Sequence, residues 1–105
     1  MSGKLGALDL AANTDTVLYT TPASTFAVAA INIVNRSSAT ITARIAISAA
    51  DAPTNAEYIE YDVGVPPKGV LERTGIVTGA NQRIVVRSSA TDVNAVAYGI
   101  TTATA

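Results

Sequence analysis

The chain has 105 residues, seven of them basic and eight acidic, and a net charge of −1 at neutral pH. A chain of this length forms one domain, and its hydrophobic fraction of 49% is enough for a single two-layer core. It contains no cysteine and no histidine, which excludes disulfides, thiolate chemistry and the commonest general base and metal ligand. It has no run of lysine and arginine of the kind that binds nucleic acid, so we expect no nucleic-acid partner.

The first residues predict a short arm followed by extended chain. Residues 1–7 lack the continuous apolar segment of a secretory signal, and we expect them to form an N-terminal arm. Leu8, Leu10 and the segment 17–20 indicate either a first strand pair or one strand broken at 13–15, where Asn and Asp favour a turn. Pro22 closes that strand because it lacks an amide donor. No apolar run approaches the roughly 18 residues of a membrane helix, so we expect no membrane partner.

Two alternating runs organise the chain that follows. Period-two alternation with β-branched residues is typical of strands that pack on a core by one face. The polar segment 36–40 between the runs predicts a hairpin or a short corner. The faces expected to be buried consist of Ala27, Ala29, Ile31 and Ile33 in the first run, and Ile41, Ala43, Ile45 and Ile47 in the second.

Residues 49–57 form the longest connection of the chain. Thr54 and Glu57 within it match a capping box, which predicts a one-turn helix. Beyond it, 58–65 alternates as a strand, and the Pro-Pro-Lys-Gly segment at 66–69 predicts a turn. We expect the return strand of a hairpin to begin after that turn.

The C-terminal part predicts two further strands, at about 82–87 and 93–102, and a small polar tail at 103–105. The sequence Arg-Ser-Ser-Ala-Thr occurs twice, at 36–40 and at 87–91. Either a duplicated strand–turn–strand unit or the common use of these residues in loops explains the repeat.

Seven or eight short strands separated by turn signals predict an all-β fold. We expect a two-sheet antiparallel β-sandwich that occupies residues 8–102 as a single domain. Both an Ig-like and a jelly-roll topology fit the strand pattern.

Charged residues on the predicted strands are the candidates for a functional surface. Glu60 and Asp62 fall on one strand face, with Cα atoms about 6.5–7 Å apart. Two carboxylates at such a separation serve glycoside hydrolysis or calcium binding when a sugar cleft or further oxygens are present. The sequence indicates neither, so a solvated outer face is the favoured interpretation.

Three arginines are expected on the outward faces of neighbouring strands, where they would pair with carboxylates across strands or across a subunit boundary. Such pairs would set register and partner choice more than affinity. The candidate interface residues are Arg44, Arg83 and Arg87, together with Glu60, Asp62 and Glu72.

Catalytic and cofactor chemistry has no support in the sequence. The serines and threonines have no histidine to activate them, which excludes a hydrolytic triad. The chain has no phosphate-binding or dinucleotide-binding glycine motif. The segment 35–37 matches a glycosylation sequon, which is expected to be inert without a secretory signal. We expect a protein that is not an enzyme and needs no cofactor or metal.

Short phrases along most of the chain follow the pattern T-x-L-Y-T-x-P-A, V-N-R, Y-I-E-Y-D, G-V-L-E-R-T-G-I and I-x-V-x-S. In this sequence they overlap the segments 11–22, 31–36, 58–62, 70–75 and 83–88. Together they resemble small virion structural proteins of tailed bacteriophages, including those that infect cyanobacteria. The resemblance implies a β-sandwich module, used as capsid decoration or in tails and fibres, with no catalytic residues to carry over.

The resemblance leads to a first hypothesis, a capsid decoration or cement protein that is located in the virion. Its partner would be the major capsid protein, and the chain would form a homo-oligomer, either a trimer or a dimer. The alternative within the virion is a tail, neck or fibre component. A carbohydrate-binding or adhesion module is a third reading, which the absence of tryptophan and of a secretory signal disfavours.

Overall fold

The computed structural model describes residues 2–103, and nearly all of them lie in extended chain. Their only helix is the single 3₁₀ turn η1, so none is long and apolar enough to cross a membrane. The predicted all-β fold is confirmed. The elements are β1 (Ser2–Leu10), β2 (Thr16–Thr20), β3 (Thr25–Asn35), β4 (Ile41–Ser48), η1 (Asn55–Glu57), β5 (Tyr58–Val65), β6 (Val70–Thr78), β7 (Arg83–Ser88) and β8 (Val93–Ala103).

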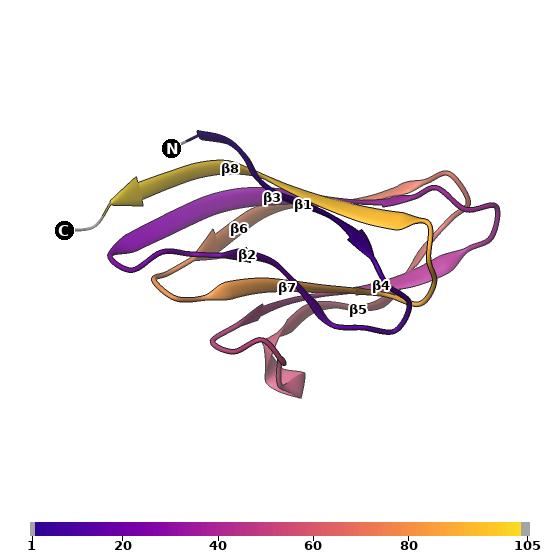
Figure 1. Cartoon of the computed structure of the whole chain (residues 1–105), viewed down its shortest axis with the longest axis horizontal. Helices are drawn as coiled ribbons and strands as arrows, with labels where there is room; N and C mark the ends of the chain where they lie inside the picture. The colour runs from indigo at the N-terminus through magenta and orange to yellow at the C-terminus, as the bar shows by residue number, and fades with distance from the viewer. Residues whose placement is uncertain (1, 104–105) are drawn as a thin grey trace.

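The strands form two four-stranded antiparallel sheets that face each other (Figure 1). Sheet A has the order β1-β8-β3-β6, and sheet B has the order β2-β7-β4-β5. This is the strand order of a jelly roll, in which two Greek keys wrap around one core. The Ig-like alternative does not fit, because in that fold the strands divide between the sheets in a different order.

Consecutive strands of this fold pair only at β4 and β5. The segment 36–40 is therefore a corner between the sheets, and the predicted hairpin across 66–69 is wrong, since β5 and β6 lie in different sheets. Strands are present at 8–10 and 17–20 as expected, but they belong to β1 and β2 of different sheets, so they are neither a pair nor one broken strand. Turn residues determine where the chain reverses, but they do not determine which sheet the next strand joins.

The predicted N-terminal arm is instead part of a sheet. Residues 2–10 form β1 and pair with β8, from Ser2 opposite Ile100 to Leu10 opposite Val93. Gly3 and Gly6 interrupt the apolar alternation in the first part of this strand, which is why the sequence predicted extended chain only from residue 8. At the other end, Ala103 closes β8, whereas residues 1 and 104–105 lie outside the described residues.

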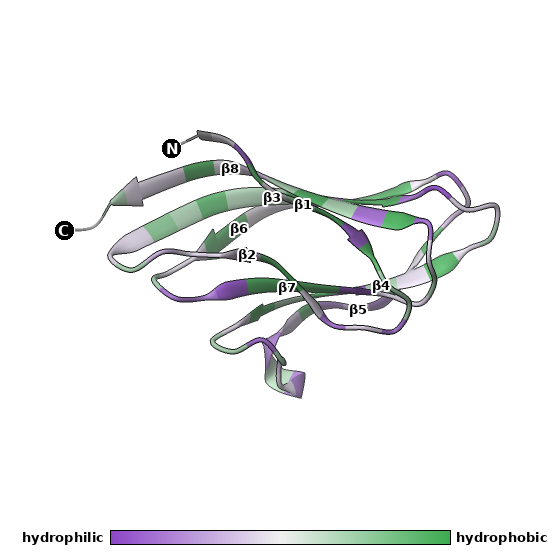
Figure 2. Cartoon of the chain, in the orientation of Figure 1, coloured by the Kyte–Doolittle hydropathy of each residue, from purple (hydrophilic) through white to green (hydrophobic). Residues whose placement is uncertain are grey.

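The core lies between the two sheets, and the alternating runs supply much of it. The predicted inward residues of β3 are all buried, as are Ile41, Ala43 and Ile45 of β4, while Ile47 is partly buried against the core. In Figure 2, β7 is hydrophobic along its middle and hydrophilic at its ends. The core comprises Leu10, Leu18, Ala29, Ile31, Ile33, Ile41, Ala43, Ile45, Val65, Ile76, Ile84, Val86, Val93, Ala95 and Ala97.

Asn35 holds the corner between β3 and β4. Its side chain is fully buried, and its Nδ2 donates to the carbonyl oxygens of Ala39 at 2.8 Å and of Val65 and Pro66 at 3.1 Å. Its Oδ1 accepts the Ser37 amide at 2.9 Å. The asparagine of the glycosylation sequon is therefore part of the folded interior.

The repeated Arg-Ser-Ser-Ala-Thr segments both cross between the sheets, from β3 to β4 and from β7 to β8. The hydroxyl of Ser37 donates to the Ala39 carbonyl at 3.0 Å, and that of Ser88 donates to the Ala90 carbonyl at 2.8 Å. As in any jelly roll, the first four strands and the last four strands occupy equivalent positions in opposite sheets, so that β3 corresponds to β7 and β4 corresponds to β8. The fold therefore places the two repeated segments at equivalent corners.

The predicted one-turn helix is present as η1. The Glu57 carboxylate accepts the Thr54 amide at 2.8 Å, so this part of the capping box forms. The same carboxylate accepts the Ser48 hydroxyl at 3.1 Å and the Ala49 amide at 3.3 Å. One side chain thus ties the long connection 49–57 to the end of β4.

Candidate functional site

The outer face of sheet B carries three arginines on its two central strands. Arg44 of β4 lies directly opposite Arg87 of β7, and Arg83 lies opposite Ser48. The prediction that these arginines occupy neighbouring strands is confirmed. Like charges directly opposite each other destabilise a sheet unless nearby groups compensate for them.

Each arginine of this face has a carboxylate partner. The Arg44 guanidinium donates to both oxygens of Asp62, at 2.7 and 3.2 Å, in the bidentate geometry that favours strong pairing. Arg83 contacts Asp51 at 2.9 Å. The Arg87 guanidinium lies 3.6 Å from Asp15, within ion-pair range but beyond a hydrogen bond. These three carboxylates offset the repulsion between the arginines.

Two tyrosines of β5 complete the surroundings of Arg44. Its guanidinium carbon lies 4.2 Å from the ring centroid of Tyr61 and 6.0 Å from that of Tyr58, within the range of cation–π attraction. The two rings meet edge to face at 5.0 Å. The guanidinium is therefore held by a carboxylate and an aromatic ring together.

The pairing between Arg44 and Asp62 also sets their protonation. The hydrogen bond from Arg44 lowers the pKa of the Asp62 carboxyl below its ordinary value, and the charges of Arg44 and Arg87 add to this effect. The same bond raises the pKa of Arg44. Both groups therefore stay charged throughout the neutral range.

A polar pocket of about 220 Å³ opens beside this pair. The Ser88 hydroxyl donates to the Ala90 carbonyl and the Ser89 hydroxyl accepts the Thr42 amide, so both are engaged in holding loops. Among residues 2–103 no cluster of three carboxylates could hold a metal ion. The pocket is lined by Asn13, Thr42, Arg44, Asp62, Arg87, Ser88 and Ser89, and it presents charge and hydroxyl groups without a paired nucleophile and base.

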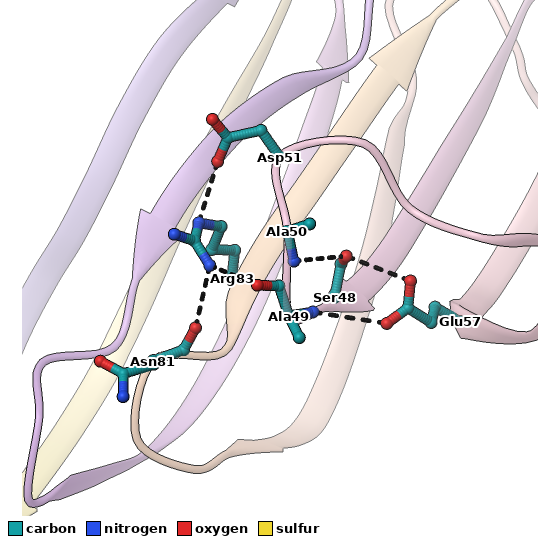
Figure 3. Close-up of polar contacts among 7 residues, drawn as sticks. All are labelled: Ser48, Ala49, Ala50, Asp51, Glu57, Asn81 and Arg83. Atoms are coloured by element: carbon teal, nitrogen blue, oxygen red, sulfur yellow. Dashed lines mark hydrogen bonds and ion pairs between the residues drawn. The ribbon is translucent and has the colours of Figure 1, made fainter.

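At the other end of this face, the connection 49–57 is fixed to β7. Arg83 donates to the carbonyl oxygens of Ala49 at 2.6 Å and Asn81 at 3.1 Å while it pairs with Asp51 (Figure 3). Figure 3 also shows Glu57 bound to Ser48 and Ala49 on the other side of the same loop. Thr54 donates its amide to Glu57, which lowers the pKa of that carboxyl. The loop is thus held at both ends.

The other candidate residues lie elsewhere. Glu60 lies opposite the buried Ile45, and its carboxylate contacts Arg73 of sheet A at 3.5 Å. The alternation predicted that Glu60 and Asp62 share a face, and this prediction is wrong. The pairing of β4 with β5 shifts register between Ala43 and Ile45, and Asp62 has a φ of 52°. This bulge turns the strand and separates the two carboxylates.

Glu72 is also remote from the three arginines. It lies on β6 of sheet A, opposite Asn32, and accepts a hydrogen bond from the Tyr98 hydroxyl at 3.4 Å. The structure thus groups Arg44, Asp62, Arg83 and Arg87, and excludes Glu60 and Glu72 from their surface.

Sequence reasoning missed Asp15 and Asp51, which neutralise Arg87 and Arg83. Both lie in connections rather than strands, so no alternation marked them. Their only signal was the position of an acidic residue beside a predicted strand end. That signal does not identify an arginine more than 30 residues away.

No family model, curated protein or solved structure matches this chain. The function is therefore argued from the geometry of its surfaces.

Proposed function

We propose that this chain is a non-enzymatic structural protein of a tailed-phage virion, and that it binds the outside of the assembled capsid and stabilises it. The observation that carries the proposal is the outer face of sheet B. Its charged side chains are ordered in advance by partners in the chain: Arg44 with Asp62 and Arg87 with Asp15 beside a small polar pocket, and Arg83 with Asp51 at the other end of the face. The serine hydroxyls of the pocket are engaged in holding loops, and the face as a whole suits recognition of a protein surface.

The phrases that carry the resemblance to phage structural proteins support the same surface. Two of them, 58–62 and 83–88, lie on β5 and β7 of sheet B and include Asp62, Arg83 and Arg87. The jelly-roll architecture also recurs in viral capsid domains, although lectins and cupins share it, so this support is an analogy.

The proposed mechanism is burial of this face and the adjoining loops against the major capsid protein at capsomer junctions. Side chains that are already held by partners lose little freedom on binding, which favours association. Charges placed this way mainly select the partner and the register of contact. The added contacts would oppose the outward pressure of packaged DNA.

The first test is the copy number of the chain in purified particles, measured by quantitative mass spectrometry against the major capsid protein. A ratio near one, or a simple fraction of it, supports a decoration protein on the shell lattice. A few to a few dozen copies would assign the chain to the tail, neck or fibres. Absence from the particle would overturn the virion role.

A second test measures binding of the purified chain to shells that lack it. The variant Arg87→Gln removes a cation of the proposed contact surface and should weaken binding. The matched control is Lys68→Gln, which removes a cation from the connection after β5. The Lys68 amine donates to the carbonyl of Arg36, which follows β3. Equal binding by the two variants would argue against a contact through sheet B.

A further inference from the structure

The outer face of sheet A is apolar and exposed. Seven large hydrophobic side chains of the described chain are exposed, and six of them lie on this face. Tyr61 of β5 is the exception. The six are Phe26, Val28, Val70, Val77, Tyr98 and Ile100, with 36% to 59% of each exposed.

The strand register arranges these side chains in rows across the sheet. Val28 of β3 lies directly opposite Val77 of β6 on one side and Ile100 of β8 on the other. On either side of this row, a large residue lies beside a small one. Tyr98 is opposite Ala30, and Phe26 is opposite Thr102.

Besides Asp9, which pairs with Arg36, two charges of opposite sign stand at the edges of the same face. Lys4 is on β1, opposite Tyr98, and Glu72 is on β6, opposite Asn32. Neither belongs to an ion pair within residues 2–103. All five arginines belong to ion pairs, whereas Lys4 and Glu72 do not.

We propose that this face binds the same face of a second copy of the chain, related by a two-fold axis that runs parallel to the strands between β3 and β8. This axis lays β3 of each copy over β8 of the other, and β1 over β6. Each side chain of β3 then meets its own register partner in the second copy. Tyr98 then lies over Ala30, Phe26 over Thr102 and Val28 over Ile100, so the apolar rows of the two copies face each other.

The charges favour the same arrangement. By the strand register, Glu72 of one copy lies over Ala7 of the other, one row from Lys4 on one side and one row from Asp9 on the other. Asp9 is already paired with Arg36, so Lys4 is the cation beside Glu72 that lacks an ion partner, and the symmetric interface contains this pair twice. A two-fold axis across the strands would instead bring each edge against itself, so that like charges meet. Sheets that pack face to face lie about 10 Å apart with strands within about 30° of parallel, a spacing that these side chains fill. Removal of the apolar rows from water supplies the driving force.

This inference does not depend on the proposed role in the virion, because it concerns a different face and a different partner. A dimer formed through sheet A leaves both sheet B faces directed outward. The two proposals are therefore compatible, and each fails separately.

The test is sedimentation equilibrium of the purified chain over a wide concentration range. The wild-type chain should dimerise, and Ile100→Glu should remain monomeric with an unchanged circular dichroism spectrum. Lys4→Glu and Glu72→Lys should each weaken dimerisation by roughly threefold or more, since surface ion pairs are modest and each change affects two of them. The double variant Lys4→Glu/Glu72→Lys should restore it, and Lys68→Glu is the matched control.

Several outcomes would overturn the proposal. A wild-type chain that is monomeric at every concentration rules out the dimer. A monomer that binds shells and loses this binding in Ile100→Glu would assign the face to the capsid instead of a second copy. A dimer that the double reversal does not restore would rule out this axis. Because Lys4 and Glu72 are exposed, their variants decide the question even if Ile100→Glu fails to fold.

Discussion

The two outer faces of this jelly roll differ in how their side chains are satisfied. On sheet B, Arg44, Arg83 and Arg87 have carboxylate partners within the chain. On sheet A, the hydrophobic rows are exposed, and Lys4 and Glu72 have no ion partner in the described chain. The comparison teaches that the same alternating pattern can produce one outer face whose charges are paired within the chain and another whose apolar side chains are left exposed to water.

The largest effect is expected from a side chain added where the backbones of β8 and β3 approach closely beneath the apolar rows. Gly99 of β8 has a φ of 154°, and a Cβ there would overlap the carbonyl oxygen of Val28 and lie 2.9 Å from the Ala29 Cα. Gly99→Ala should therefore separate β8 from β3 and reduce the free energy of unfolding by roughly 3 kcal/mol or more. Chemical denaturation measures this loss.

The control for that variant is Gly75→Ala on the edge strand β6. Gly75 also has a positive φ, of 71°, but nothing lies within 4 Å of a Cβ placed there. Its cost should be limited to backbone strain, about 1 kcal/mol. Equal losses in the two variants would contradict the role of close approach between β3 and β8.

The second effect concerns the joint between the two sheets. Thr21 follows β2 and Thr78 ends β6, and their fully buried hydroxyls share a hydrogen bond of 2.6 Å. Thr78→Val should cost about 1–3 kcal/mol of unfolding free energy, because it removes the partner of the buried Thr21 hydroxyl. The double variant with Thr21→Val should lose less than the sum of the single variants. Strict additivity in the denaturation data would rule out the coupling.

A smaller effect tests the self-satisfied charges of sheet B through pH. The pKa of Asp62 is lowered in the folded chain, so the folded state binds this proton less strongly than the unfolded state does. The stabilisation is therefore present above the ordinary carboxyl pKa of about 4, and it is lost as the pH falls through the lowered folded value. The Tm difference between wild type and Asp62→Asn should be constant near neutral pH and shrink below about pH 4.

The matched control repeats the pH series in an Arg44→Gln background, which removes the main cause of the shift. There the effect of Asp62→Asn on Tm should depend much less on pH. An unchanged pH dependence would mean that another group holds the carboxylate.

The smallest effect is expected at an ion pair that joins β1 to the corner after β3. Arg36 contacts Asp9 at 2.6 Å, but the two side chains are 49% and 77% exposed. Asp9→Asn should change the free energy of unfolding by less than about 1 kcal/mol. A loss above about 2 kcal/mol in urea denaturation would show that exposed pairs of this protein matter more than their solvation suggests.

Sequence reasoning reached most of the strands because alternation is a local property. The burial of Ala27, Ala29, Ile31 and Ile33 follows directly from the pattern of β3. It missed the first part of β1, because glycines hide the alternation there, and it placed Glu60 and Asp62 together because a bulge is invisible to a period-two pattern. Both misses arise where the backbone departs from regular extended geometry.

The candidate site was predictable only in part, for the same kind of reason. The arginines fell on strands and could be assigned to neighbouring positions, and Asp62 was among their expected partners. Asp51 and Asp15 reach Arg83 and Arg87 from connections that are distant in sequence. Their proximity exists only once the corners have placed the loops over sheet B.

The sequence by itself determined which segments are strands and which side of most of them is buried, because side-chain alternation is written residue by residue. Only the tertiary structure decided which strands pair, and hence that the chain is a jelly roll with one charged and one apolar outer face. The reason is physical: strands pair through backbone groups that nearly every residue shares. The choice of partner therefore depends on how the whole chain packs its core.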